Sequence, residues 1–432
     1  MSFRDLFKTK TKNLESVATN YLKGILNAEL VNIQSVCESI DSFSYHKLHH
    51  FISNSPWSYR SVFSQVASEV SNHFNQNQDI CLIIDESGVK KKGNSSVGVM
   101  NQYCGNLGKI DNCQVAVYGS LCQGEFSSII DARLYLPNKW CEDEIRCNKA
   151  KIPVSHQVFK TKIELATEII NQQIETHIKF DYVLMDAFYG RDASFTQQIH
   201  DLGKYFIGDV RINQMVYFEK PSLVVKPKKG IRGKKPTKLI PDKQGIRLGE
   251  YLSGLKSYHF RKMTIRNTAK GKLRVKAHGI KVWIYDEANQ KFYERTLVIR
   301  RNLNKNSASQ VDYFLTNMSL EDFHLKQIIK KHATRYFIEH NFKEAKSGLG
   351  MHQFQTRKWI AWYHQTALIM IIQAYIMMQK IKTFDIFPIL SANDVILLVR
   401  TIMRKNQSFQ NAIRIFYSRY FSRQYDVNLH YI

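Results

Sequence analysis

This 432-residue sequence has no paired cysteine motif, few acidic residues and no long apolar run. Its seven cysteines form no Cys-x-x-Cys pair and no zinc-ligand spacing, which argues against a zinc site. Their odd number and the lack of a recognisable leader predict a reducing cytoplasm. The longest apolar run, residues 367–378, is interrupted by Gln373 and is too short to cross a bilayer. We therefore expect a buried core helix there and no membrane partner.

Basic residues outnumber acidic ones by 62 to 37, which gives a net charge of +25. An apolar content of 44% with 12% aromatic residues is that of a folded protein. A charge excess of this size costs self-repulsion and indicates a polyanionic partner, either nucleic acid or an acidic membrane. The excess is concentrated between residues 220 and 281, where 19 Lys and Arg side chains are accompanied only by Asp242 and Glu250.

Within that basic stretch, residues 226–235 have the composition of a basic loop. A solvated linker and a localisation-like signal are the alternatives to a binding role. Because the rest of the chain is also basic, we favour contact with the phosphate backbone of nucleic acid. The side chains we expect to make it are Lys228, Lys229, Arg232, Lys234 and Lys235.

The apolar pattern predicts short strands interrupted by helices. Three strands come first, then a helix over residues 159–174, then two more strands. A basic segment with further alternating strands follows, and a helix carrying Glu339 comes after it. This order predicts an α/β fold with a ribonuclease H-like mixed sheet, interrupted by an all-β insertion and flanked by helical N- and C-terminal regions. The predicted strands are 80–84, 114–121, 129–136, 182–185, 205–210, 273–285, 296–300 and 312–316.

Three carboxylates occupy positions that this fold would bring together. Asp85 ends the apolar run 80–84, and Asp186 ends the run 182–185. Glu339 lies four residues after Arg335 and seven before Lys346, so all three project from one side of the predicted helix. Taken alone, Glu339 reads as part of a surface salt-bridge ladder, and each aspartate as a cap on a turn.

Together the three acids predict a metal centre. Carboxylates a few ångströms apart repel and raise one another's pKa unless cations lie between them. Two Mg²⁺ ions about 3.5–4 Å apart, with Mn²⁺ as a substitute, would make Asp85, Asp186 and Glu339 a site for in-line displacement at phosphorus. Arg335 and Lys346 would then grip phosphate near the scissile bond; the alternative is ion pairing with Glu339. Weaker candidates by position are Glu86, Asp181, Asp192 and Glu344.

The motifs resemble those of bacterial insertion-sequence transposases of the DDE superfamily, in the branch with a β-strand insertion. Residues 83–88 with Lys92-Gly93 are similar to the first catalytic aspartate block, and residues 185–190 to the second. Arg335, Glu339 and Lys346 match the signature of the third block, where His332 replaces the usual tyrosine. The resemblance covers about residues 44–370. Further matching stretches are 102–105, 107–109, 112–114, 348–350 and 357–359.

The resemblance implies a DNA transposase that nicks inverted-repeat ends and joins the 3′-hydroxyls to target DNA. It implies double-stranded DNA as partner, a synaptic homodimer and a bacterial, nucleoid-associated location. Second-strand cleavage through a hairpin is plausible, with Trp283 or Tyr285 stacking on a flipped base; alternating strand-face packing is the better-supported interpretation of both. A ribonuclease H-like nuclease without strand transfer and a non-cutting DNA-binding regulator stay open as alternatives.

We expect five segments along the chain. The first reads as helical and DNA-binding, in part because residues 45–52 and a helix starting at Ser55-Pro56 have the order of a helix-turn-helix. That signal is weak, because many plain helical pairs look the same. The predicted segments are the N-terminal region 1–77, the first part of the catalytic domain 78–211, the basic β-strand insertion 212–318, the second part of the catalytic domain 319–380 and the helical C-terminal region 381–432.

Overall fold

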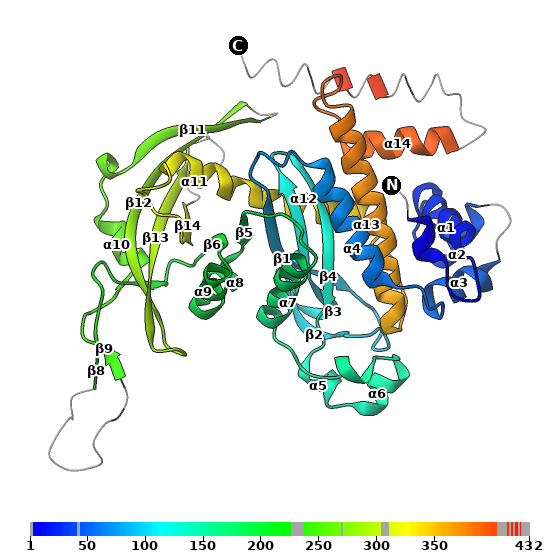
Figure 1. The fold of residues 1–432 in the computed structure, drawn as a ribbon, viewed down its shortest axis with the longest axis horizontal. Coiled ribbons are helices and arrows are strands. Elements are labelled where there is room, and N and C mark those ends of the chain that lie inside the picture. The colour runs from blue at the N-terminus through cyan, green and yellow to red at the C-terminus, as the bar shows by residue number, and fades with distance from the viewer. Residues whose placement is uncertain are drawn as a thin grey trace. The chain divides into compact units, whose positions relative to one another are not determined.

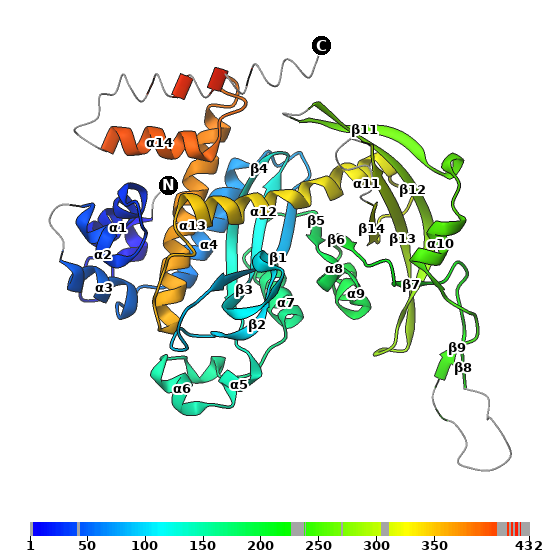
Figure 2. The ribbon, with the colours of Figure 1, turned by 180° about the vertical axis from the view of Figure 1, so that it is seen from behind.

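The structure, a computed structural model, describes residues 3–40, 44–225, 237, 239–268, 271–303, 311–403, 413, 416–417, 420–421 and 424. Two compact units make up the chain, and we describe each by itself. Unit 1 comprises the residues up to Phe180 and those from Tyr336 to Asn428, and unit 2 comprises Asp181–Arg335. Figures 1 and 2 show their elements from opposite sides.

Antiparallel strands arranged around one long strand form the sheet of unit 1. β1 (Cys81–Lys90) pairs with β3 (Lys109–Gln123), and β3 pairs with β4 (Phe126–Leu134). β2 (Met100–Cys104) pairs with the first residues of β3. The prediction ended the first strand at residue 84 and contained no strand at β2. In the structure β1 continues to Lys90 because β3 is long enough to pair with it throughout.

Helices cover both faces of this sheet. On one face lies α7 (Lys162–Glu175), which approaches β3 closely because Gly119 there has no side chain; a Cβ at Gly119 would lie 2.7 Å from Ile169. On the other side lie α12 (Tyr336–Lys343) and α13 (Trp359–Lys382) (Figures 1 and 2). Most of α13 is buried, which confirms the core helix predicted over 367–378. No helix in the described part of the chain is long and apolar enough to span a membrane.

The N-terminal helices also belong to unit 1, and α3 packs on α13. α4 begins at Tyr59 with Ser58 as its N-cap, not at Ser55-Pro56 as predicted. Its apolar stripe is buried, and the helix packs on β4 and α13. The second helix of the proposed helix-turn-helix therefore packs its apolar stripe into the core of unit 1, and a DNA-binding role for this helical pair stays a prediction. The helices of this unit not yet bounded are α1 (Glu15–Asn27), α2 (Ile33–Glu38), α3 (Tyr45–Ser53), α4 (Tyr59–His73), α5 (Asn138–Cys141), α6 (Glu144–Lys149) and α14 (Ala392–Met403).

Unit 2 is built on a mixed sheet. β5 (Tyr182–Met185) and β6 (Tyr205–Asp209) are parallel, and β14 (Val311–Thr316) pairs antiparallel with β6. β13 (Lys291–Asn302), β12 (Gly271–Asp286) and β11 (Arg261–Thr268) continue the sheet in that order, all antiparallel. The helices flanking it include α8 (Ala187–Gly190), α9 (Ala193–Asp201) and α11 (Leu325–His332).

The prediction of an all-β insertion is wrong, because the insertion contains a helix, α10 (Leu248–Gly254). Leu248 is fully buried and packs with Val282 and Leu297 in the core of the unit, so this helix is part of the fold rather than a surface turn. Two small antiparallel pairs complete the insertion. They are β7 (Met215–Val216) with β10 (Ile246–Arg247), and β8 (Leu223–Val225) with β9 (Leu239–Pro241).

The observed class is α/β with mixed strand pairing and helical N- and C-terminal regions, which confirms the predicted class and is consistent with a ribonuclease H-like fold. The compact units divide at 180/181 and 335/336 rather than at the predicted boundaries. Residues on either side of 77/78 belong to one unit, because α4 packs on β4. As a functional division, the five predicted segments stay a prediction.

Candidate active site

Asp85 lies in the middle of β1, half-buried, opposite Tyr118 of β3. The Glu86 N–H donates to its Oδ1 at 2.7 Å, which orients the carboxylate. Successive side chains on a strand point to opposite faces, and Glu86 accordingly forms an ion pair with Lys162 of α7, with Nζ and Oε2 2.7 Å apart. Glu86 is thus on the α7 face and Asp85 on the opposite one, as the strand period predicted.

The helix carrying Glu339 packs on the face of unit 1 to which Asp85 points. Tyr118, the cross-strand neighbour of Asp85, makes an edge-to-face contact with Phe342 of α12, with ring centroids 5.2 Å apart. Phe342 is buried and follows exposed Glu339 by one helical turn. Asn341 fixes the helix in place, since its Nδ2 donates to Ser120 Oγ at 2.7 Å. Two of the three predicted acids are therefore carried on one side of one sheet.

Lys346 is anchored to the strand that bears Asp85. Its Nζ donates to the Gly88 carbonyl at 3.0 Å, three residues beyond Asp85. Burial lowers the pKa of Lys346 to about 8, because the carbonyl stabilises the ammonium less than water does. Lys91, just past the end of β1, is similar: it donates to the Phe354 carbonyl, and burial lowers its pKa to about 8.

Asp186 follows β5 in unit 2 and caps α8. Its Oδ1 accepts from the backbone N–H groups of Phe188 at 2.9 Å and Tyr189 at 3.4 Å. Burial nevertheless raises the pKa of Asp186, against the lowering effect of those N–H groups and of Arg335. A buried carboxylate of this kind is a group that a bound cation would stabilise.

A further acid of unit 2, Asp209 at the end of β6, was not among the predicted site residues. Its Oδ1 accepts from His332 Nε2 at 2.6 Å, and its Oδ2 lies 3.1 Å from Arg335 Nε. Burial would raise the pKa of Asp209, but His332 and Arg335 outweigh it and leave the pKa below its usual value. His332 is itself buried and stacks on Phe314, with centroids 4.1 Å apart. Asp209 therefore holds the His332 and Arg335 side chains within unit 2.

Arg335, Glu339 and Lys346 lie in one continuous helical stretch whose winding changes on either side of α12. Arg335 closes a 3₁₀ turn (Ala333–Arg335), Glu339 lies in α12, and Lys346 lies in a π-helical turn (Glu344–Gly348). The regular α-helical period assumed over 335–346 therefore does not hold throughout, and the shared direction of the three side chains stays a prediction. Each cation is instead placed by its own contact, Arg335 by Asp209 and Lys346 by Gly88.

Asp85 and Glu339 belong to unit 1 and Asp186 to unit 2. Among the described residues, no group of three or more His, Cys, Asp and Glu side chains has the spacing of a metal site. The three-carboxylate ligand set and its Mg²⁺ or Mn²⁺ ions therefore stay a prediction. The basic side chains Lys228, Lys229, Arg232, Lys234 and Lys235 lie outside the described residues.

The two aromatic side chains considered for base stacking pack within unit 2. Trp283 exchanges backbone hydrogen bonds with Tyr217, and Lys220 Nζ lies 5.1 Å from the Trp283 ring centroid. Tyr285 stacks on Phe292, with centroids 4.9 Å apart. These contacts agree with strand-face packing.

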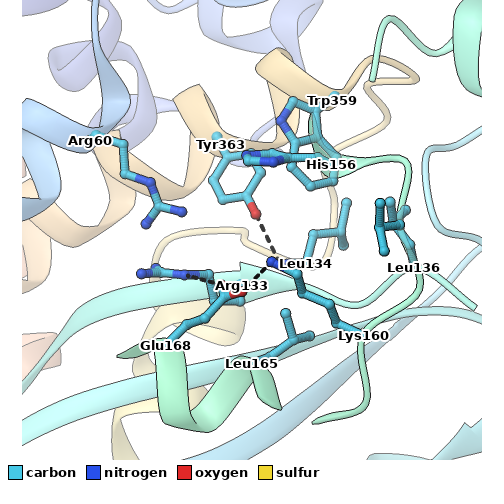
Figure 3. A pocket seen from close by; sticks show the side chains of 11 residues that line it. Arg60, Arg133, Leu134, Leu136, His156, Lys160, Leu165, Glu168, Trp359 and Tyr363 are labelled. Atoms are coloured by element: carbon cyan, nitrogen blue, oxygen red, sulfur yellow. Dashed lines mark hydrogen bonds and ion pairs between the residues drawn. The ribbon is translucent and has the colours of Figure 1, made fainter. Parts of the chain in front are cut away.

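Unit 1 also contains a small pocket between α4, β4, α7 and α13, shown in Figure 3. Its volume is about 40 Å³, enough for a few water molecules at roughly 10–15 Å³ each. Each of its three cations is paired with an acid: Arg60 and Arg133 share Asp131, and Arg133 and Lys160 share Glu168. The Tyr363 hydroxyl accepts from the Leu134 N–H at 3.1 Å and ties α13 to β4. We interpret this pocket as a structural part of unit 1, because its cations already have acidic partners.

The mixed sheet, with acidic residues in or directly after its strands, is consistent with proteins of the ribonuclease H-like fold. The chain belongs to the DDE superfamily endonuclease family, which it matches over residues 3–272. That stretch contains Asp85 and Asp186 and ends before Glu339. A segment of 172 residues is 33% identical to the probable transposase for insertion sequence element IS701 of Microchaete diplosiphon. The aligned segment is 39% of this chain and spans only 41% of that relative's length.

Proposed function

We propose that the protein is a DNA transposase that cuts at the ends of its element and joins the 3′-hydroxyls to target DNA. The observation that carries this proposal is the placement of Asp85 and of the helix bearing Glu339 on one side of the unit 1 sheet, in a chain of the DDE endonuclease family. The printed name of the relative, a probable insertion-sequence transposase, supports the same conclusion.

Asp85, Asp186 and Glu339 are the residues we propose to hold two divalent ions, Mg²⁺ or Mn²⁺. All three offer oxygen donors, which these ions prefer over zinc-type nitrogen and sulfur sets. The raised pKa of buried Asp186 fits a role beside a cation. When bound, such ions activate the attacking oxygen and stabilise the leaving oxygen at phosphorus.

The chain itself orients the reacting groups. The N–H groups of Phe188 and Tyr189 fix the Asp186 carboxylate, and the Glu86 N–H fixes that of Asp85. Arg335, held by Asp209, and Lys346, held by Gly88, are the cations proposed to contact phosphate. The lysine-rich segment 226–235 adds a sequence-independent contact to the DNA backbone.

The proposed partners are transposon-end and target duplexes and a second copy of the chain in the synaptic complex. Cleavage of the second strand through a hairpin is one route such a reaction can take. A nuclease without strand transfer is the second candidate, because Asp85 and Glu339 support cutting as well as joining. A non-cutting regulator is disfavoured by the presence of all three acids.

The test is cleavage of labelled duplexes that carry the DNA ends flanking this gene, with Mg²⁺ and with EDTA. We expect metal-dependent nicks at the ends with the wild type and none with Glu339→Gln. Glu344→Gln is the matched control, because Glu344 is a weaker candidate by position and contacts His340 at 3.0 Å within unit 1. Joining of a pre-cut end to a plasmid separates transposase from nuclease. End binding without any cutting by the wild type would favour the regulator.

A further inference from the structure

The end of the β2–β3 hairpin carries apolar side chains that the fold of unit 1 leaves exposed. A 3₁₀ turn (Gly105–Leu107) and Gly108, at φ +62°, join the two strands. Tyr103 and Ile110 face each other across the hairpin and are 56% and 71% exposed, and Leu107 in the turn is 43% exposed. Single exposed apolar residues are ordinary, but three gathered at one hairpin end suggest a contact surface.

This hairpin end lies on the same face of the unit 1 sheet as Asp85. Ile110 precedes Tyr118 by eight residues along β3, and the period of two puts both on one face. Tyr118 stands opposite Asp85. At about 3.3 Å per residue, the hairpin end is about 26 Å along the strand from the Asp85 position. Between them the face is covered, because Gln114 is buried and donates to the Val97 carbonyl at 2.6 Å.

The charge around the hairpin end favours a polyanion as its occupant. Lys109 and Lys90 have side chains 65% and 59% exposed, and Lys92 is also exposed. Asp111 is the acid beside them, and it pairs with Lys90 at 2.9 Å and with Lys109 at 4.0 Å. A second copy of this chain would bring the same basic excess and a net charge of +25 to the contact. Duplex DNA instead offers phosphates to the lysines and a groove to the apolar side chains.

We infer that the hairpin-end patch, formed by Tyr103, Leu107 and Ile110, is a DNA contact that wedges into a groove of the bound duplex while the flanking lysines meet its backbone. For a duplex whose axis runs along β3, at about 3.4 Å per base pair, a span of about 26 Å corresponds to about 8 base pairs between this contact and the phosphate cut at Asp85. The inference rests on the proposed function, because it takes Asp85 as the cutting position.

The test uses the full-length protein and a duplex carrying one of the ends that flank the gene. Ile110→Ser and Tyr103→Ser are compared with Ile145→Ser, which removes an aliphatic side chain that is 83% exposed on α6 of the same unit. Substitutions at exposed positions change stability by less than about 0.5 kcal/mol. We expect the Kd from fluorescence anisotropy to rise about tenfold for the two hairpin variants and to stay unchanged for Ile145→Ser.

Position is tested by replacing Tyr103 with the photo-crosslinker p-benzoylphenylalanine, with Ile145 replaced in the control. We expect a crosslink to DNA about 8 base pairs from the nick and none from the control position. Unchanged affinity of both hairpin variants, a crosslink only to a second copy of the chain, or a crosslink at a distant base pair overturns the inference while wild-type binding and cutting stand. A wild type that neither binds nor cuts the ends refutes the proposed function, and the hairpin contact with it.

Discussion

The two cations proposed to contact phosphate are held in opposite ways in the two units. In unit 2, Arg335 is held by the carboxylate of Asp209, so its charge is balanced. In unit 1, Lys346 donates to the Gly88 carbonyl, and burial lowers the pKa of its ammonium group. A guanidinium keeps its charge at any pH a protein survives, whereas a poorly solvated ammonium does not. The contrast teaches that Arg335 keeps its charge across the working pH range, whereas the charge of Lys346 depends on pH.

The largest expected effect is on the nicking rate, and it should distinguish Asp85 from Glu86, which points to the opposite face of the sheet. Asp85→Asn should lower the nicking rate by about a thousandfold, because loss of a metal ligand removes several kcal/mol of stabilisation at phosphorus. Glu86→Gln, one residue on but directed at Lys162, should change the rate little. Single-turnover nicking of end-labelled DNA measures both. Equal losses in the two variants would mean that the strand, rather than the carboxylate, matters.

The next effect concerns the stability of the contacts that Asp209 makes with His332 and Arg335. Asp209→Ala leaves His332 and Arg335 without their shared acid, and breaking a buried ion pair from one side costs about 3 kcal/mol. Urea unfolding should show a lower midpoint at an unchanged slope. Asp111→Ala, which removes pairs with two exposed lysines, Lys90 and Lys109, should cost less than about 1 kcal/mol.

The same network has a predictable pH dependence. The pKa of Asp209 is lowered in the folded protein, so its contribution to stability is present above the unfolded pKa of 3.8 and is lost as pH falls toward the folded value. Asp209→Asn should remove the part of the loss of folding stability at low pH that comes from Asp209. Identical acid unfolding curves for wild type and variant would contradict this assignment.

A smaller effect is expected from the basic segment. Replacing Lys228, Lys229, Lys234 and Lys235 with Gln should weaken binding of every DNA sequence alike. Each lost phosphate contact lowers the slope of log affinity against log salt by roughly 0.9. Titrations of end DNA and of unrelated duplex at several salt concentrations measure this. A loss confined to the end sequence would show that these lysines read bases rather than the backbone.

The sequence allowed the strand-borne acids to be predicted because each ends or follows an apolar run. Asp209 carries the same signal, at the end of the run 205–209, and was missed because a three-acid site did not require it. Its pairing with His332, 123 residues away, is a tertiary contact that no local pattern contains. The strand β2 was missed because its residues alternate only partly and its pairing depends on β3.

The helix with Glu339 shows a different limit. Residues 335–346 fit a regular helical period, so the sequence predicted one helix. The π turn at Glu344–Gly348 changes that period, and Lys346 reaches Gly88 from within it. Such a turn is set by packing, here the full burial of Ala345 and Leu349, and not by local propensity.

The smallest effect concerns Lys346. As pH rises, DNA affinity and folding stability should change in opposite directions. Because the pKa of Lys346 is lowered to about 8 from 10.5, the side chain is charged below pH 8 and increasingly neutral above it. DNA affinity should therefore fall severalfold as pH rises through 8, by the loss of one charge contact. Folding stability should rise over pH 8 to 10.5, because the folded state favours the neutral amine more than the unfolded state does. Lys346→Arg keeps its charge and should lose both trends in side-by-side anisotropy and urea titrations. A wild-type affinity that is flat across pH 8, with the variant flat as well, would show that Lys346 does not touch DNA.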